Sequence, residues 1–312
     1  MKKIFTITIC ISVFLNIILF LFVFSKTTSE PVEYEPPATT YSFLSPRIFI
    51  ENRNDIILNF VDLRKQLREY GAKHPGLGIY FEYLPSGISA GVNEKQNYFL
   101  ASLLKTPMVM AVYKQIENKE WSKSDVLTIQ PQDLDPFFGD LYKKGAGTRL
   151  TLEEAIGLAL VQSDNTAKSA LFAHLPDKAL DEVFDYLDIP KELDGVLPVV
   201  TPKNYSSILR SLYLSSYLDK SSSNEILTYL TQTPFSDKLV APIPKEVRVA
   251  HKIGVYDEGN PEKSVYTDCG IVYVPKRPYI LCLMDRDIEK NATTHMIDVS
   301  KMVYTYVSSY SQ

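Results

Sequence analysis

The sequence has 312 residues, of which 45% are hydrophobic and 22% are charged, which is typical of a folded globular protein and excludes a disordered or low-complexity chain. With 33 Lys and Arg against 37 Asp and Glu, the formal charge is -4, so the chain lacks the cationic excess that nucleic-acid binding requires. Its three Cys have no CxxC or Cys/His spacing, which excludes a disulfide scaffold, structural zinc and Cys-ligated clusters.

The chain begins with a segment that predicts export. Residues 4–24 form an uncharged run behind Lys2 and Lys3, and as a helix this run is long enough to cross a hydrocarbon core of about 30 Å. Because a signal peptide has a shorter apolar region, we expect residues 1–25 to be an uncleaved membrane anchor, with a cleaved signal as the alternative. Either way the positive charges stay in the cytoplasm and the rest of the chain is extracytoplasmic.

The remaining sequence divides into a linker and a folded domain. Residues 26–50 are rich in Pro, Thr and Glu and poor in large aliphatic residues, which predicts an extended, solvated linker. Residues 51–312 are predicted to form one catalytic domain, in which apolar residues at helical spacing indicate a first helix over 55–70, ending at Gly71.

Strands are predicted near both ends of this domain and helices in its middle. Thr151 and Glu154 form a capping box at the start of one of the middle helices. Because strands at both ends enclose the helices, we expect an α/β (α+β) fold with one antiparallel sheet and helices segregated around it. The predicted segments are strands at 77–84, 88–93, 247–256, 267–275 and 278–285, a mainly helical region at 102–232, and a last helix at 294–308.

Two cysteines fall on neighbouring predicted strands. A hairpin turning at Lys276-Arg277 sets Ile271 opposite Cys282 and leaves Cys269 diagonal to Cys282. Diagonal pairs are rarely bridged, so we expect buried free thiols, with a disulfide as the alternative in an oxidising compartment.

Three short motifs offer side chains for nucleophilic catalysis. Ser102-Leu103-Leu104-Lys105 is the only S-x-x-K in the chain. On a helix its amine lies beside its hydroxyl and can take the serine proton. Ser163-Asp164-Asn165 follows the capped helix, and Lys252-Ile253-Gly254 lies on a strand whose alternation puts Lys252 and Gly254 on one face. Each motif alone has an ordinary structural explanation, but together and in this order they indicate a serine hydrolase.

The motifs resemble the S-x-x-K, S-D-N and K-T-G marks of the class A β-lactamase and penicillin-binding serine hydrolase superfamily. The resemblance covers about residues 55–310. It implies a five-stranded antiparallel sheet flanked by helices, an all-helical lobe, and a nucleophile between the two. It also implies an acyl-enzyme mechanism on a β-lactam or a related amide, with no cofactor and no metal.

The resemblance assigns catalytic roles to three residues. Ser102 would be the nucleophile, Lys105 its general base, and Ser163 the proton shuttle to the leaving nitrogen. A neighbouring cation such as Lys252 would lower the pKa of Lys105 towards the range of a useful base.

Substrate-binding roles fall to four further positions. Asn165 would hold the substrate amide, and Lys252 would supply positive charge near the substrate carboxylate. Gly254 and Val255 would line the strand beside the substrate, where the backbone N–H groups of Ser102 and Val255 would form the oxyanion hole.

The third motif departs from the family pattern because Ile253 replaces a threonine. The lost hydroxyl removes a hydrogen bond to a charged group, worth about 1.5–3 kcal/mol, unless another donor substitutes. Arg248, upstream on the same predicted strand face, is the candidate substitute, and a solvent-facing arginine is the alternative.

The sequence also lacks the E-x-x-L-N glutamate that activates the deacylating water in class A β-lactamases. The carboxylates available in the corresponding stretch are Asp185, Asp188, Glu192 and Asp194. A missing general base costs about 10²–10⁴ in rate, so we expect acylation to survive and deacylation to be slow.

Alternatives to a β-lactam-hydrolysing enzyme stay open. The substrate is either a β-lactam or the D-Ala-D-Ala end of peptidoglycan, which would make the protein a carboxypeptidase or transpeptidase. A wall-fragment sensor without turnover is the non-enzymatic alternative. The four histidines are scattered, and His251 is predicted to be a packed strand residue rather than a catalyst.

Overall fold

The computed structural model of the chain describes residues 42, 43, 57 and 59–309. The chain divides into two units, residues 1–40 and 41–312, and all described residues belong to the second. In this described part, no helix combines the length and the apolar character needed to cross a bilayer. The predicted anchor at residues 4–24 lies outside the described residues.

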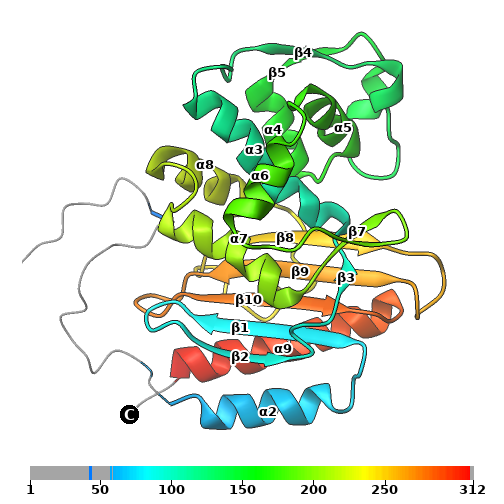
Figure 1. Cartoon of the computed structure of the whole chain (residues 1–312). Helices are drawn as coiled ribbons and strands as arrows, with labels where there is room; N and C mark the ends of the chain where they lie inside the picture. Colours follow the sequence, from blue (N-terminus) through cyan, green and yellow to red (C-terminus); the bar gives the residue numbers. More distant parts are fainter. Residues whose placement is uncertain (1–41, 44–56, 58, 310–312) are drawn as a thin grey trace, which may run out of the picture. The chain divides into compact units, whose positions relative to one another are not determined.

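A five-stranded antiparallel sheet forms the centre of the second unit, in the order β2-β1-β10-β9-β8 (Figure 1). The N-terminal hairpin therefore pairs through β1 with the C-terminal strand β10, as the strands at both ends of the sequence predicted. Because β8 is at the edge, one side of its backbone is not paired with a strand. The strands are β1 (Leu77–Tyr83), β2 (Ile88–Val92), β8 (Val249–Tyr256), β9 (Val265–Val272) and β10 (Tyr279–Asp285).

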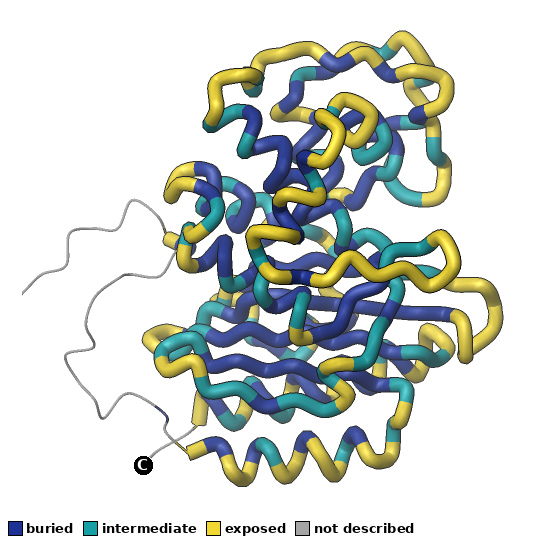
Figure 2. Tube along the Cα trace, viewed as in Figure 1, coloured by how far each residue is buried: buried dark blue, intermediate teal, exposed yellow. Residues whose placement is uncertain are grey.

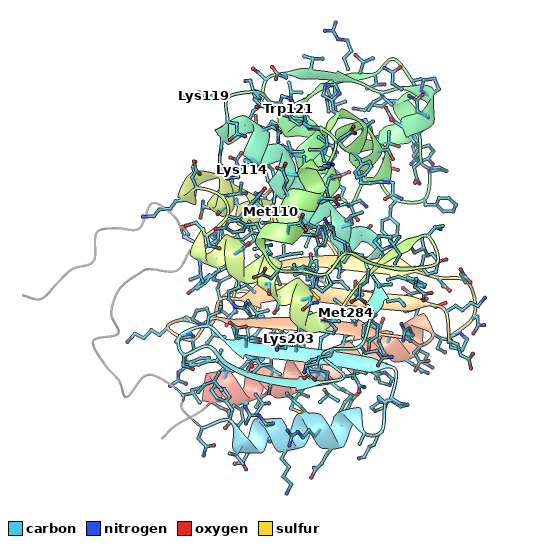
Figure 3. The ribbon with its side chains drawn as sticks, viewed as in Figure 1. Met110, Lys114, Lys119, Trp121, Lys203 and Met284 are labelled. Carbon is cyan, nitrogen blue, oxygen red and sulfur yellow. The ribbon has the colours of Figure 1, made fainter. Side chains whose placement is uncertain are left out.

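Both faces of the sheet are covered, and β1, β9 and β10 are buried along their whole length (Figure 2). Burial on both faces explains why these strands read as nearly continuous apolar runs. One face packs against α2 (Val61–Gly71) and α9 (Glu289–Ser309), in a core that includes Leu281 and Leu283. The other face packs against a helical lobe, and Met284 of β10 and Met110 of that lobe belong to this second core (Figure 3).

The middle of the chain forms the helical lobe. Thr151 and Glu154 form the predicted capping box, since the Thr151 hydroxyl accepts from the Glu154 N–H at 3.2 Å and the Glu154 carboxylate accepts from the Thr151 N–H at 2.7 Å. The helices are α3 (Lys105–Glu117), α4 (Leu152–Val161), α5 (Asn165–His174), α6 (Ala179–Tyr186), α7 (Pro202–Leu214) and α8 (Lys220–Leu230).

Short elements connect these helices. A 3₁₀ turn, η2 (Ala101–Leu104), leads directly into α3, and two further 3₁₀ turns are η3 (Pro131–Asp133) and η4 (Leu141–Lys144). The sequence predicted no strands in this region, but short ones occur at β3 (Tyr98–Phe99), β4 (Val126–Thr128), β5 (Arg149–Thr151), β6 (Glu192–Asp194) and β7 (Leu197–Val200). Strands of two to four residues are too short for an alternating pattern to identify them.

The predicted register of the β9–β10 hairpin is wrong. Cys282 lies directly opposite Cys269, and Ile271 lies opposite Ile280. The connection is a six-residue loop, residues 273–278, that carries Pro275 and Pro278, rather than a tight turn at 276–277. Both cysteines are nonetheless buried free thiols, as predicted.

The structure also differs from the predicted linker at Phe43. This residue is buried, its ring packs edge-on against Tyr273 at 5.2 Å, and its carbonyl accepts a hydrogen bond from the Tyr273 hydroxyl. Its N–H donates to Asn224 Oδ1. A large aromatic side chain removes enough apolar area from water to dock even in a Pro-rich segment.

Candidate active site

Ser102 lies at the junction of the helical lobe and the sheet. It occupies the 3₁₀ turn η2 rather than the regular helix that the sequence predicted, and its side chain is half-buried. Two features fix this turn. Ala101 has a φ of 43°, and the preceding Leu100 N–H donates to the carbonyl of Pro198 in β7.

Lys105 joins the first two motifs. As the first residue of α3, its Nζ lies 2.7 Å from Ser102 Oγ, 2.7 Å from the Ser163 carbonyl, 3.0 Å from Ser163 Oγ and 2.7 Å from Asn165 Oδ1. The structure therefore brings together the four residues Ser102, Lys105, Ser163 and Asn165, as the motifs predicted.

Burial gives this amine an unusual basicity. The Lys105 side chain is almost completely removed from water, and burial, followed by the nearby positive charges of Lys252 and Lys168, lowers the pKa of Lys105 to about 6. A lysine with such a pKa is largely neutral at pH 7 and has a lone pair available. The amine can therefore accept the proton of the Ser102 hydroxyl.

Lys252 lies on the edge strand β8, and its charge acts on Lys105. Its burial lowers its pKa to about 7, against the opposing effect of Asp268. Its Nζ has no hydrogen-bond partner among the residues that the structure describes. A buried polar group without a partner is costly, so this amine is arranged to receive a ligand atom that the protein does not supply.

Asp164 fixes the positions of Ser163 and Asn165 through hydrogen bonds that it accepts from backbone N–H groups. One of its carboxylate oxygens accepts from the Ala167 N–H at 2.8 Å and caps α5, and the other accepts from the Leu141 N–H at 2.9 Å. Ser163 has a φ of 56°, in the left-handed region. With these two hydrogen bonds the Asp164 carboxylate holds the strained turn in place, and so fixes Ser163 and Asn165 beside Lys105.

Gly254 allows β8 to approach the nucleophile turn. A Cβ at this position would lie 2.6 Å from Thr267 Oγ1 and 3.4 Å from both the Ala101 Cβ and the Leu100 carbonyl. The side-chain face of Lys252 and Gly254 is therefore the face that meets η2, as the alternation predicted. Val255 follows on the same edge strand and is half-buried.

Arg248 does not substitute for the missing threonine and is instead solvent-facing, which was the alternative left open by the sequence. Arg248 is exposed, precedes β8, and its guanidinium lies 5.4 Å from the centre of the Phe43 ring. It lies at the opposite end of the strand from Gly254, because four residues of extended chain separate it from Lys252. Ile253 itself is buried and offers no hydroxyl.

The four candidate carboxylates of the 185–194 stretch all face solvent. Asp185 pairs with Lys191 at 2.9 Å, and Glu192 accepts from the Asn97 side-chain amide. No contact joins any of them to Ser102 or Lys105 within the part of the chain that the structure describes. None of these four carboxylates is therefore placed to act on Ser102 in the described part of the chain, whereas Asp164 and Asp135 lie close enough to raise the pKa of Lys105.

A buried His–Asp pair lies beneath β8, and the sequence predicted only its histidine half. His251 Nδ1 lies 2.7 Å from Asp268 Oδ1, and Asp268 Oδ2 accepts from the Leu239 N–H at 3.0 Å. His251 is thus a packed strand residue, as predicted. Asp268 has no local motif that identifies it, yet its charge acts on Lys252. The group of described residues that can hold a metal ion lies elsewhere, at Asp285, Asp287 and His295.

Comparison with known proteins agrees with this architecture. The family model described as "Beta-lactamase enzyme family" matches residues 62–307. A β-lactamase of Phocaeicola vulgatus is 23% identical over 246 residues, covering 70% of this chain and 77% of its own length. The β-lactamase VEB-1 of Pseudomonas aeruginosa is 23% identical over 260 residues, covering 75% and 86% respectively.

Solved structures show the same fold. The structure of PBP-A superposes with a TM-score of 0.73 at 24% identity, covering 80% of this chain and 97% of PBP-A. The extended-spectrum β-lactamase TLA-3 superposes with a TM-score of 0.73 at 20% identity, covering 80% and 100%. From the family match and this shared architecture, the chain belongs to the β-lactamase enzyme family and is a class A β-lactamase-like hydrolase.

Proposed function

We propose that the protein is a serine hydrolase that forms an acyl-enzyme at Ser102 with a β-lactam or a related amide and deacylates slowly. The observation that carries this proposal is the 2.7 Å contact between Lys105 Nζ and Ser102 Oγ, made by an amine whose pKa burial lowers to about 6. A neutral amine at hydrogen-bond distance from a hydroxyl is the arrangement that general-base activation requires.

In the acylation step, Ser102 Oγ forms a bond to the amide carbonyl carbon while Lys105 takes the hydroxyl proton. The carbon–nitrogen bond of the amide then breaks. Ser163 Oγ, 3.0 Å from the Lys105 amine, passes a proton from that amine to the leaving nitrogen. The proton taken from Ser102 is thus replaced on the leaving group, and Lys105 returns to its neutral form.

Substrate binding would use the remaining motif residues. The Asn165 oxygen accepts from Lys105, and its side-chain NH₂ has no hydrogen bond within the described residues, so it can donate to the substrate amide. The unpartnered Lys252 amine would receive the substrate carboxylate. The N–H groups of Ser102 and Val255 would stabilise the oxyanion, while Gly254 leaves room for the strand to approach.

Slow deacylation follows from the chemistry missing around Ser102. A water that attacks the acyl-enzyme needs a base, but the four carboxylates of the 185–194 stretch are exposed, and the buried Asp164 accepts from the Ala167 and Leu141 N–H groups instead. For a related fold, a variant of PBP-A is described as an acyl-enzyme complex with penicillin G. A long-lived adduct is therefore the expected product with a penicillin.

The second candidate function is a D-Ala-D-Ala carboxypeptidase or transpeptidase. The same Ser102 and Lys105 chemistry serves a peptide amide. The four carboxylates of the 185–194 stretch are not placed to activate water, and an enzyme of this type does not need the fast deacylation of a β-lactamase. A wall-fragment sensor without turnover is the third candidate. For each, we propose an extracytoplasmic protein tethered to the cytoplasmic membrane by residues 1–25, because Lys2 and Lys3 precede the apolar run.

Intact-protein mass spectrometry of the full chain in detergent, mixed with a penicillin and followed over minutes to hours, tests the proposal. We expect a stable adduct of one penicillin, lost in Ser102→Ala and retained in Ser124→Ala, which changes an exposed serine. A transient adduct with hydrolysed drug would identify a true β-lactamase with an unrecognised base. Release of D-Ala from a stem peptide would favour the peptidase. No adduct and no release would leave the sensor.

A further inference from the structure

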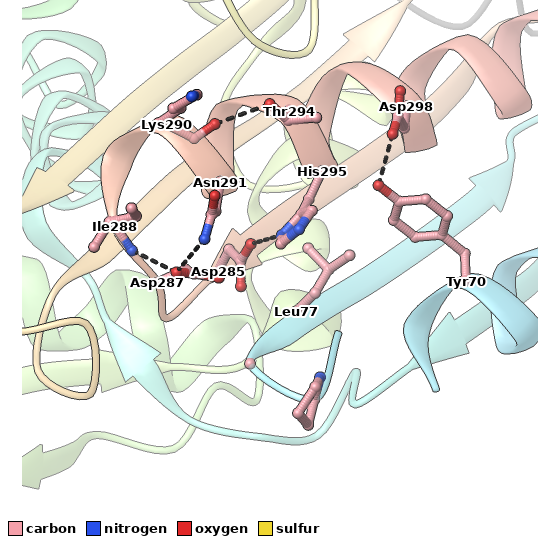
Figure 4. Close-up of polar contacts among 12 residues, drawn as sticks. Tyr70, Leu77, Asp285, Asp287, Ile288, Lys290, Asn291, Thr294, His295 and Asp298 are labelled. Carbon is pink, nitrogen blue, oxygen red and sulfur yellow. Dashed lines mark hydrogen bonds and ion pairs between the residues drawn. The ribbon is translucent and has the colours of Figure 1, made fainter. Parts of the chain in front are cut away.

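A second cluster of titratable side chains lies on the face of the sheet opposite Ser102. Asp285 ends β10 and shares the strand face of Leu281 and Leu283, which pack against α2 and α9. His295 projects from α9 towards it, and Asp287 lies between β10 and α9 (Figure 4). Three segments of the chain therefore meet here, since His74 from the turn before β1 completes the group.

The contacts within this cluster are close. Asp285 Oδ2 and His295 Nδ1 are 2.7 Å apart, and both residues are buried. The rings of His74 and His295 have centroids 3.9 Å apart. Asp287 uses one oxygen, Oδ1, to accept from the Ile288 N–H and the Asn291 side chain. Asp285, Asp287 and His295 each offer one ligand atom, and these three atoms lie within 4.8 Å of one another.

Two carboxylates, one of them 1% exposed, and two neighbouring imidazoles line one cavity, which leaves room for a cation beside them. Arg286 does not fill the role, because its guanidinium donates to the Asn97 carbonyl and lies over the Tyr98 ring.

The cluster opens into a cavity that an ion can enter. The cavity has a volume of about 240 Å³, and its lining includes His74, Gly76, Glu262, Asp285, Asp287 and His295. Gly76 forms its floor, where a Cβ would lie 2.4 Å from the Arg286 carbonyl and 3.3 Å from Asp285 Oδ1. The absent side chain keeps the space beside the carboxylate accessible.

We propose that Asp285, Asp287 and His295 bind one divalent transition-metal ion of the Zn²⁺ type, and that His74, which lines the same cavity, moves towards the ion as a fourth ligand. Two imidazoles and two carboxylates match the nitrogen and oxygen ligands of Zn²⁺ and are too few oxygens for Ca²⁺. On binding, the metal replaces the hydrogen bond between His295 Nδ1 and Asp285 Oδ2, and the neutral imidazole carries its single proton on Nε2. The ion would tie β10, α9 and the α2–β1 turn together, away from the catalytic serine.

The cysteine spacings and scattered histidines of the sequence predicted no metal site. That prediction considered ligands close together along the chain, whereas His74 and His295 come from opposite ends of the domain and meet only through the pairing of β1 with β10. The proposal is independent of the reaction at Ser102.

Metal titration of the tag-free full chain in detergent, stripped beforehand with a chelator, tests this site. With ZnCl₂ and a chromophoric competitor we expect one Zn²⁺ per chain, and with CoCl₂ the intense visible absorption of a four-coordinate ion. At 100-fold excess over Kd, Zn²⁺ should raise Tm by about 5 °C. Binding of less than one ion per chain, or a purely six-coordinate cobalt spectrum, would overturn the proposal.

Two variants and a matched control separate ligation from general charge attraction. Asp287→Asn keeps the acceptor for Asn291 and should fold, and His74→Gln changes a half-buried side chain. Each should weaken Zn²⁺ binding by about 10–100-fold. Asp298→Asn removes an exposed carboxylate from α9, the helix that carries His295. Asp298 accepts a hydrogen bond from Tyr70, and the variant should leave the Kd for Zn²⁺ unchanged. Equal losses in Asp287→Asn and Asp298→Asn would reduce the site to nonspecific attraction.

Discussion

Lys105 of α3 and Lys252 of β8 are both buried, and the charge of Lys252 is the largest influence on the pKa of Lys105 after burial. The two amines differ in their contacts. Lys105 touches four oxygen atoms, whereas Lys252 Nζ has no partner within the described residues. In the proposed mechanism the first amine loses a proton and the second holds an anion, which predicts a defined pH dependence for the site.

The second-order rate constant of acylation by a penicillin should have a narrow pH optimum. Lys105 must be neutral to act as a base, so the rate rises through its pKa of about 6. Lys252 must be charged to attract the substrate carboxylate, so the rate falls above its pKa of about 7. Stopped-flow acylation at subsaturating drug across the pH range measures this profile, and a rate that climbs steadily to about pH 9 would contradict it.

Replacing Lys252 should change both limbs of that profile. Lys252→Ala removes a cation next to Lys105, so the pKa of Lys105 rises and the acid limb moves to higher pH, while the alkaline limb disappears. Lys168→Ala is the control, because Lys168 also lowers the pKa of Lys105 but more weakly. It should move the acid limb less and keep the alkaline limb. An unmoved acid limb in Lys252→Ala would disprove the electrostatic coupling.

The same burial predicts a cost in stability. The pKa of Lys252 is about 7 in the folded protein and about 10.5 in the unfolded chain, so the unfolded chain binds more protons between these values and wild-type stability rises with pH across that window. Lys252→Met has no amine to bury and so lacks this cost in folding free energy. It should therefore unfold at a higher temperature than the wild type at pH 7, by about 2–4 °C for each kcal/mol relieved, and the gap should shrink towards pH 10.

Thermal melts at several pH values check this difference. Lys203→Met is the matched control, because Lys203 is an exposed lysine of α7 (Figure 3) and should give no gap that depends on pH. A Lys252→Met variant less stable than the wild type at pH 7 would mean that the buried amine is held by favourable contacts in the free protein.

The sequence predicted the strands of the sheet well because their buried runs are long and apolar. It predicted the first helix poorly. That helix begins at Val61, because the Asn59 side chain accepts from the Val61 N–H and forms a turn just before it. Apolar spacing continues through this turn, with Phe60 buried, so periodicity alone cannot locate the first residue of the helix.

The β9–β10 register escaped prediction for a different reason. The predicted and observed registers differ by two residues, and a shift of two leaves every side chain on the same face of the sheet. The burial pattern therefore fits both. The loop decides between them, through Lys276 at a φ of 60° and the Arg277 N–H donating to the Val274 carbonyl. Neither the backbone angle of Lys276 nor the hydrogen bond of Arg277 can be recognised from the sequence.

The candidate site was predictable only where contacts follow from motifs. Ser102 and Lys105 meet through helical spacing, and Ser163 and Asn165 come to them as one tripeptide. By contrast, the hydrogen bond from the Leu141 N–H to Asp164 and the influence of Asp268 on Lys252 depend on tertiary packing. Those contacts link segments whose proximity no local pattern encodes.

Asp164 should therefore be more important for the shape of the site than for its chemistry. Asp164→Ala removes a helix cap worth about 1 kcal/mol and leaves the buried Leu141 N–H without its acceptor, which costs about 1–3 kcal/mol more. We expect a lower Tm together with slower acylation. Asp219→Ala, which removes a comparable cap from α8, should lower Tm without slowing acylation. Slower acylation in both variants would remove the link to Ser163.

Cys269 and Cys282 should stay reduced even in an oxidising compartment. Cys269 and Cys282 are directly opposite, where Cβ atoms lie about 4.5–5.5 Å apart, longer than the usual 3.5–4.5 Å of a disulfide. Both are fully buried, and burial raises the pKa of Cys269 well above its ordinary value. A thiol reagent should leave both untouched in the native protein and label both after unfolding without reductant. A mass two hydrogens lower would instead reveal the disulfide.

Gly254→Ala should disturb the strand beside the nucleophile turn. The new Cβ would lie 2.6 Å from Thr267 Oγ1, so either β8 or the Thr267 side chain must move. Because displacements near 1 Å can reduce rates by about 100-fold, we expect a large fall in acylation with little change in Lys105 pKa. Adding Thr267→Ala removes the colliding hydroxyl, while the contacts to Ala101 and Leu100 at 3.4 Å are tolerable. The double variant should thus acylate faster than Gly254→Ala alone. If it does not, the glycine is required for a reason other than this contact.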